Sequence, residues 1–356
     1  MAHSTTSAPA GPAATPPRTD TGSSRGAWAK AFLGFYRPDG AGLRELGPVT
    51  RFLYAARSVI LVISVQASLI AGLLGITDRR FDALDFVLLL VGLVVAHAIS
   101  NLSNDYFGYK RGHDTPDSPR MRYTLHPVAS GALEPRQLAT GISILATVGV
   151  AIAVYFAFAR GPVAIAFTLA GALLLWLYDA APVTLKGIGL GEVASFLVWG
   201  PLMVGGGYYV VSGQLTAAAL VASLPYGLGV MSILLGKHVD QLTFDKGAGQ
   251  RTLPVLLGEK RARLVDTVVV AGMYAFVVLG VLTGELTPFT LLVVIAAPRA
   301  LKALRVLSER HPDEPPTGYV GWPLWFHRVC LVHNRLFGWA YIAGLALGSI
   351  VPGLHL

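Results

Sequence analysis

Nine apolar stretches, separated by polar or turn-forming residues, constrain the fold of this chain more than any other feature of its sequence. A helix needs about 20 mostly apolar residues to cross the hydrocarbon core of a bilayer, and each stretch approaches or exceeds that length. The sequence therefore predicts an all-α, polytopic membrane protein of about nine transmembrane helices. The predicted spans are residues 52–76, 84–104, 138–159, 162–179, 190–211, 215–236, 264–283, 286–307 and 333–352.

The eighth stretch is the least regular of the nine. Its second half contains Pro298, Arg299, Lys302 and Arg305. Charged residues are costly inside a bilayer, so we expect this segment to leave the bilayer early or to lie partly along its surface.

The composition supports lipid as the solvent of this chain. Only 13% of its residues are charged, whereas soluble domains carry about 25%. The 40 Gly and 22 Pro agree with this, since both residues are commoner in membrane helices than in soluble ones. Cys330 is the single cysteine, which excludes an intramolecular disulfide and a cysteine-based metal cluster.

The N-terminal segment differs in composition from the rest. Residues 1–24 are rich in Ala, Pro, Ser and Thr and contain no apolar run, so they do not resemble a cleavable signal peptide. We expect residues 1–45 to form a disordered tail and residues 46–356 to form a single membrane-embedded domain.

The Lys and Arg residues indicate how the chain sits in the membrane. When the nine spans alternate in direction, one side of the membrane receives only Arg79, Arg80 and Arg160, and the other side receives the rest. Cytoplasmic loops carry the excess of Lys and Arg, so we expect a multi-pass protein of the cell membrane with a cytoplasmic N-terminus and the C-terminus opposite. The net charge of +8 is explained by this topology, and no nucleic-acid partner is expected.

The first of two polar clusters lies where the second span ends. Residues three and four apart share a helix face, and the carboxylate and amide groups here stand next to two cations. Mg²⁺ commonly uses one or two protein carboxylates together with phosphate oxygens. A solvated helix end with Asp in turn positions is the simpler alternative, but ionisable groups within an apolar helix favour function. The residues of this cluster are Asn101, Asn104, Asp105, Lys110, Arg111 and Asp114.

The second cluster lies where the sixth span ends, on the same predicted side. Asp240 and Asp245 are followed by Lys246 and Arg251, with glycines that allow close approach of a phosphate. A capped helix end would look similar. The repetition of acidic residues beside cations on one face favours a site where Mg²⁺ ions hold a diphosphate leaving group.

The chain resembles the UbiA superfamily of intramembrane prenyltransferases, and within it the 1,4-dihydroxy-2-naphthoate prenyltransferases. Asn104, Asp105 and Asp114 match the first family motif, and further matches are the stretches 126–133 and 178–192. The second family motif is matched by Asp240, Asp245, Gly249, Arg251, Thr252 and Leu253. The resemblance implies a UbiA-type bundle with a cytoplasmic cap of loops.

Two departures from the family pattern stand out. Gly108 occupies the position of the second Asp of the first motif, so one family metal ligand is missing. In the second motif, Asp240 and Asp245 are five residues apart, whereas the family spacing is four. Both departures put the metal stoichiometry in question.

The resemblance implies Mg²⁺-dependent transfer of an isoprenyl group from a prenyl diphosphate to a small aromatic acceptor of the naphthoate or quinone-precursor type. The expected partners are thus the isoprenyl diphosphate, the acceptor and the lipid bilayer. As catalytic residues and Mg²⁺ ligands we expect Asp105, Asp114, Asp240 and Asp245. As substrate-binding residues we expect Asn101, Asn104, Tyr109, Lys110, Arg111, Tyr178, Lys186, Lys246 and Arg251.

Two other functions are compatible with parts of this pattern. A terpene cyclase of the same fold would act on a prenyl diphosphate without an acceptor, and the missing carboxylate at Gly108 leaves room for that. A transporter would place its charges near the bilayer midplane, whereas the acidic residues here gather at one end of the spans. For the acceptor we expect contacts near Arg57, Ser64 and Gln66, the unusual polar residues of the first span.

Overall fold

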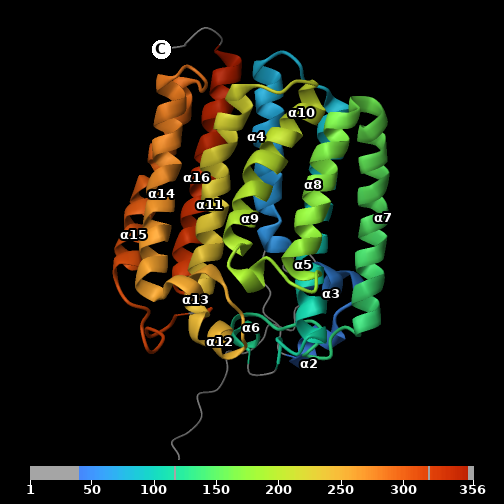
Figure 1. Cartoon of the computed structure of the whole chain (residues 1–356), viewed down its shortest axis with the longest axis vertical. Coiled ribbons are helices and arrows are strands. Elements are labelled where there is room, and N and C mark those ends of the chain that lie inside the picture. The colour runs from blue at the N-terminus through green and yellow to red at the C-terminus, as the bar shows by residue number, and fades with distance from the viewer. Residues whose placement is uncertain (1–39, 116–117, 320, 352–356) are drawn as a thin grey trace, which may run out of the picture.

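The computed structural model describes residues 40–115, 118–319 and 321–351 as a bundle of helices, and these ranges contain no strand (Figure 1). The all-α prediction is therefore confirmed. Most residues of the expected N-terminal tail, 1–39, lie outside the described ranges, and its last part forms the short helix α2 (Gly40–Glu45).

Seven segments are long and apolar enough to cross a membrane, and they match the first seven predicted spans. Their boundaries follow the predicted ones closely, but α5 and α11 continue for one or two turns into polar sequence. The segments are η1 and α4 (Ser58–Thr77), α5 (Ala83–Lys110), α7 (Pro135–Arg160), α8 (Pro162–Asp179), α9 with η3 and α10 (Gly191–Ser212), α11 (Ala217–Asp240) and α14 (Glu259–Leu282).

The last two predicted spans also correspond to helical segments. The eighth is divided into the 3₁₀-helix η4 (Pro288–Ala296) and α15 (Ala297–Ser308), and the ninth is α16 (Phe326–Ile350). Since these two segments are outside the group of seven, the total of nine spans stays a prediction.

Local sequence signals explain where several helices begin. The side chain of Asp82 accepts a hydrogen bond from the backbone N–H of Asp85 at 2.9 Å, which caps α5. Thr216 caps α11 in the same way. Between α7 and α8, Gly161 adopts a positive φ of 71° and Pro162 starts the next helix, which gives a two-residue reversal.

The short helices gather at one end of the bundle, where they cover the polar ends of the spans. Figure 1 shows α2, α3, α6, α12 and α13 at this end, below the long helices. This confirms the expected cap of loops, and we call it the capped end. The helices not yet delimited are α3 (Pro48–Ala55), α6 (Pro119–Tyr123), η2 (Lys186–Ile188), α12 (Leu242–Gly247) and α13 (Leu253–Leu257).

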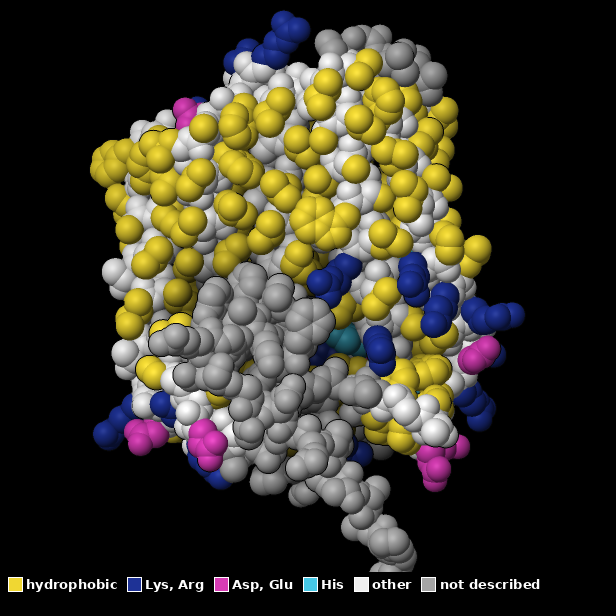
Figure 2. Space-filling view, turned by 180° about the vertical axis from the view of Figure 1, so that it is seen from behind, with side chains coloured by type: hydrophobic (Ala, Val, Ile, Leu, Met, Phe, Trp, Pro, Cys, Tyr) yellow, Lys and Arg dark blue, Asp and Glu magenta, His cyan; other side chains and the backbone are white. Residues whose placement is uncertain are grey.

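The core and the surface both fit a lipid environment. α11 packs against α14, α16 and η3, and at its crossing with η3 a Cβ on Gly227 would lie 2.9 Å from the Cα of Gly200. Such close approach through small residues is typical of membrane helices. Figure 2 shows hydrophobic side chains over most of the visible face of the long helices, with most of the visible Lys and Arg towards the capped end. The chain is therefore a multi-pass membrane protein.

Candidate active site

Two adjoining cavities open inside the bundle near the capped end. The first is polar and has a volume of about 300 Å³, and the second is mostly apolar and has a volume of about 910 Å³. Six polar side chains line both cavities, so the two spaces meet along this boundary. The shared residues are Arg57, Asn104, Arg120, Tyr123, Asp179 and Lys237.

Arg57 reaches this boundary because the chain breaks between α3 and η1. Arg57 itself adopts a left-handed conformation with φ 53°, which ends α3 and redirects the chain. Its guanidinium forms an ion pair with Asp105 and a 3.4 Å hydrogen bond to Asn104. Burial alone would lower the pKa of Arg57, but the charge and hydrogen bond of Asp105, together with Tyr123 and Asp114, raise this pKa, so the side chain stays cationic.

Asp105 lies below the cavities and does not line either of them. One of its carboxylate oxygens pairs with Arg57 and the other with Arg120 at 3.0 Å, and the residue is fully buried. Both oxygens are thus engaged by arginines. In this arrangement neither oxygen is free to bind a metal, and Asp105 holds the two arginines in place.

Asp114 occupies the space that a side chain at position 108 would need. A Cβ added to Gly108 would lie 2.0 Å from Asp114 Oδ2. His126 helps to hold this arrangement: its Nδ1 accepts from the backbone N–H groups of Val128 and Ala129, so its proton is on Nε2, which lies 3.4 Å from Asp114 Oδ2. The carboxylate of Asp114 therefore stands where the family pattern places the missing Asp.

The ionisation of Asp114 follows from the same contacts. Burial would raise the pKa of its carboxyl, but the hydrogen bond and charge of His126, together with Lys186, lower this pKa below its usual value. Asp114 is consequently an anion at neutral pH and faces the polar cavity.

The absence of a side chain at Gly108 gives a testable prediction. We expect Gly108→Ala to displace the Asp114 carboxylate and to lower enzymatic activity about 10- to 100-fold, since misplacing a binding group by 1 Å can cost about 100-fold. Steady-state rates in membranes would measure it. The matched control is Gly247→Ala, because a Cβ there meets no atom within 4 Å. Equal rates for both variants would contradict this role of Gly108.

In the second cluster, Asp245 and Gln241 line the polar cavity and Asp240 does not. Asp245 is buried, and its Oδ2 has no hydrogen-bond partner among the described residues. The carboxylate of Asp240 instead accepts hydrogen bonds of 2.9 Å from the backbone N–H groups of Phe326 and His327. Asp240 thus caps α16, and the structure does not bring it to the site where the sequence predicted it.

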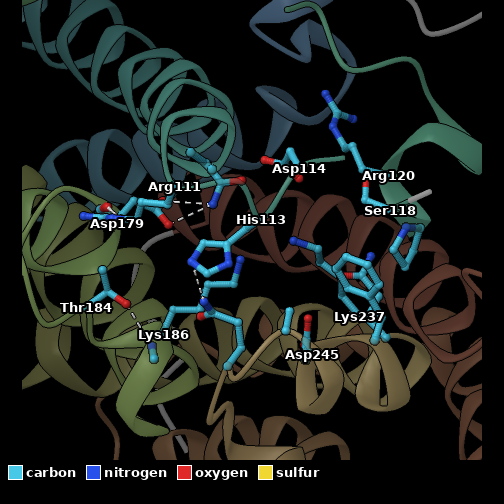
Figure 3. A pocket seen from close by; sticks show the side chains of 18 of the residues that line it. Arg111, His113, Asp114, Ser118, Arg120, Asp179, Thr184, Lys186, Lys237 and Asp245 are labelled. Carbon is cyan, nitrogen blue, oxygen red and sulfur yellow. Dashed lines mark hydrogen bonds between the residues drawn. The ribbon is translucent and has the colours of Figure 1, made fainter. Parts of the chain in front are cut away.

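Lys186 enters the polar cavity from η2 and faces three carboxylates. Burial would lower the pKa of its ammonium, but Asp179, Asp245 and Asp114 outweigh this and raise it. Asp179 is itself held at the boundary of the cavities, where its two oxygens accept from Asn104 Nδ2 at 2.9 and 3.0 Å. Figure 3 shows Asp114, Asp179, Lys186, Lys237 and Asp245 around this cavity.

The other predicted substrate-binding residues divide into two groups. Asn101 and Tyr178 line the apolar cavity, and Arg111 lines the polar one, where its guanidinium donates to backbone carbonyls that follow α8. The second group lines neither cavity, and its side chains lie at the end of α5 and after α11. These residues are Tyr109, Lys110, Lys246 and Arg251.

The apolar cavity lies among the membrane-spanning helices and carries few polar groups. His97 is one of them, with its Nδ1 2.8 Å from Ser64 Oγ and its ring in edge contact with Trp199. Gln66, which we expected near the acceptor, does not line the cavity and bonds the backbone of α16 instead. A cavity of this size and lining suits an isoprenoid chain better than a polar ligand.

The carboxylates of the polar cavity provide ligands for at most a partly protein-bound divalent metal. In the described ranges no group of three or more His, Cys, Asp or Glu side chains has the arrangement of a preformed metal site. Mg²⁺ needs fewer protein ligands when phosphate oxygens complete its shell. Asp245, with its unpartnered buried Oδ2, and the anionic Asp114 fit one such ion, but not a second.

Comparison with known proteins agrees with this geometry. The profile of the UbiA prenyltransferase family matches residues 65–331. The chain belongs to this family. It is therefore a prenyltransferase, and the resemblance noted in the sequence is confirmed.

Curated relatives include naphthoate-modifying enzymes. The chain is 26% identical over 251 residues to 1,4-dihydroxy-2-naphthoate octaprenyltransferase of Bacillus subtilis. The aligned region covers 68% of this chain and 78% of the relative. It is 26% identical over 289 residues to 2-carboxy-1,4-naphthoquinone phytyltransferase of Synechocystis, with 75% and 86% covered.

Solved structures show the same fold at low sequence identity. A UbiA homologue from Aeropyrum pernix has a TM-score of 0.59 at 15% identity, covering 80% of this chain and 97% of its own. A UbiA homologue from Archaeoglobus fulgidus bound to GPP and Mg²⁺ has a TM-score of 0.52 at 15% identity, with 83% and 99% covered.

Proposed function

We propose that this prenyltransferase transfers an isoprenyl group from a prenyl diphosphate to a small aromatic acceptor of the naphthoate type, with Mg²⁺ as cofactor. The observation that carries the proposal is the pairing of the two cavities. A polar space rimmed by cations opens directly into an apolar space of about 910 Å³. A molecule with a diphosphate head and a hydrocarbon tail matches both spaces at once.

The diphosphate would lie in the polar cavity among its cations. Lys186 and Arg57 are both cationic and face this space. Arg120 also lines it and pairs with Asp105, as Arg57 does. Charged groups in a site shielded from water stabilise the negative charge that develops on the leaving diphosphate. Mg²⁺, when bound beside Asp114 and Asp245, would add its charge to this stabilisation.

The allylic end of the donor would lie at the boundary of the cavities, where Tyr178 and Tyr123 line the space. Loss of the diphosphate leaves a carbocation, and an aromatic face is worth about 2 kcal/mol to a desolvated cation. The electron-rich ring of the acceptor then forms the new carbon–carbon bond and releases a proton. The surrounding bilayer keeps water from the cation, which would otherwise give an alcohol.

The relatives support the class of acceptor. The names of the Bacillus and Synechocystis enzymes specify a dihydroxynaphthoate and a carboxynaphthoquinone. Both are flat bicyclic rings that carry an acidic group. We infer that the acceptor's acidic group contacts the cations at the boundary and that its ring enters the apolar cavity.

The orientation in the membrane is part of the proposal. The polar cavity is lined by residues of the capped end, and most of the Lys and Arg visible in Figure 2 lie towards that end. Following the positive-inside rule, we place this end in the cytoplasm. α16 then ends on the opposite side.

Incubation of the purified protein with labelled geranyl diphosphate, with and without 1,4-dihydroxy-2-naphthoate, tests the function. We expect a prenylated naphthoate that forms only with both substrates and Mg²⁺, identified by mass spectrometry. A terpene hydrocarbon or alcohol made without acceptor would instead identify a cyclase. Full activity in the presence of a strong Mg²⁺ chelator would contradict the role of the metal.

A further inference from the structure

Lys237 occupies the boundary between the polar and apolar cavities and lines both. It lies on α11 four residues before Gln241, which in turn lies four residues before Asp245. Residues spaced by four share one face of a helix, and all three side chains line the polar cavity. Of these three side chains, only Lys237 also lines the apolar cavity. Its amine therefore lies on the side of the polar cavity where the prenyl chain would begin.

The ammonium of Lys237 is free to bind a ligand. Within the described ranges no hydrogen bond or salt bridge joins it to another side chain, whereas Arg57, Arg111 and Arg120 are all engaged by protein groups. Burial and the neighbouring cations Lys186 and Arg57 disfavour a charge on this amine, so the amine needs an anion beside it to be held as an ammonium group. An anionic ligand in the cavity would satisfy it.

The site is poor in the carboxylates that two metal ions would require. The family spacing of four, counted back from Asp245, reaches the neutral Gln241, and the other missing carboxylate is at Gly108. Asp105 is paired with arginines. Asp240 caps the first residues of α16. Asp179, the remaining carboxylate of the polar cavity, is held by Asn104 at 2.9 and 3.0 Å. Asp114 and Asp245 can hold one Mg²⁺ with the help of phosphate oxygens, and a second ion would have no carboxylate free of protein partners.

We propose that Lys237 binds the phosphate group nearest the prenyl chain and supplies the positive charge that a second metal ion would otherwise provide. This inference rests on the proposed function and makes the site a one-metal site. The carbon–oxygen bond breaks with its electron pair going to the diphosphate, and the ammonium keeps its proton and stabilises that charge. Lysine binds phosphate as a compact point charge, which suits a position beside a single oxygen.

The inference is tested by binding rather than by turnover. Isothermal titration of the detergent-solubilised protein would use geranyl thiolodiphosphate, an unreactive analogue, first in EDTA and then in Mg²⁺. We expect measurable binding in EDTA, and about 10- to 100-fold weaker binding for Lys237→Met, the usual effect of removing a hydrogen bond to a charged group. Lys237→Arg should retain binding, and Lys260→Met is the matched control, since Lys260 is exposed and outside the cavities.

Metal stoichiometry gives a second measurement that needs no variant. The unmodified protein saturated with the analogue should bind one Mg²⁺ per chain, whereas two ions per chain would overturn the inference. Equal affinity of Lys237→Met and the unmodified protein in EDTA would overturn it as well. If no analogue binds even with Mg²⁺, the proposed function itself fails, which separates the two results.

Discussion

Asp245→Asn is expected to lower kcat/KM for prenyl transfer about 1,000-fold. The substitution keeps the shape of the side chain but removes the charge of the one buried carboxylate oxygen in the polar cavity that has no partner among the described residues. A metal ion stabilises transition-state charge by several kcal/mol, and about 1.4 kcal/mol corresponds to a factor of ten in rate. Initial rates at saturating Mg²⁺, with direct titration of Mg²⁺ binding, would measure both consequences.

The matched control for this change is Asp313→Asn. Asp313 is exposed and lies outside both cavities, so the same chemical change there should leave the rate and the Mg²⁺ affinity unchanged. If Asp245→Asn binds Mg²⁺ and turns over like the unmodified protein, Asp245 is not a metal ligand. Loss of turnover with normal Mg²⁺ affinity would assign Asp245 to another task in the cavity.

The fold was largely predictable because a lipid bilayer restricts the secondary structures that a membrane-spanning chain can adopt. Backbone polar groups in a bilayer must be satisfied within a helix or a closed barrel, so long apolar stretches can be read directly as helices. Their ends are harder to read. α5 continues to Lys110 and α11 to Asp240 because hydropathy marks the edge of the hydrocarbon and not the end of helical hydrogen bonding.

The candidate site was predicted in part. Asp114, Asp245 and Asn104 line the polar cavity as the clusters indicated, and Lys186 lines it as the family resemblance implied. Asp240 was predicted there from the second acidic cluster and the match to the family motif. A difference of five residues turns a helix by about 140° beyond one full turn, so the two carboxylates face different neighbours.

The residues that sequence reasoning missed lie at the ends of apolar runs. Asp179 ends a predicted span and Lys237 directly follows one, where a charge is easily interpreted as an anchor at the membrane surface. The spacing of Lys237, Gln241 and Asp245 was the available signal. For Arg120 the sequence contained no such signal. Its contact with Asp105 forms only because the loop after α5 folds back and brings α6 against α5.

Asp105→Leu is expected to destabilise the protein more than any other single change in the cluster. The carboxylate is fully buried and pairs with Arg57 and Arg120 at once, so its loss leaves two guanidinium groups without their counter-ion. Removing one partner of a buried ion pair costs about 3–5 kcal/mol. Thermal unfolding in detergent should show a clear loss of Tm, and prenyl transfer should fall with it because both arginines line the cavities.

The same residue separates a positioning role from a metal-binding role. If Asp105 holds the arginines, Asp105→Asn should lower the affinity for inorganic pyrophosphate in EDTA, since Arg57 and Arg120 lose their fixed positions. Its effect on Mg²⁺ affinity should be small, because neither Asp105 oxygen faces the polar cavity. A variant that keeps its pyrophosphate affinity but loses Mg²⁺ binding would return Asp105 to the metal ligands. That result would also require the Asp105–Arg57 pair to open when the metal enters.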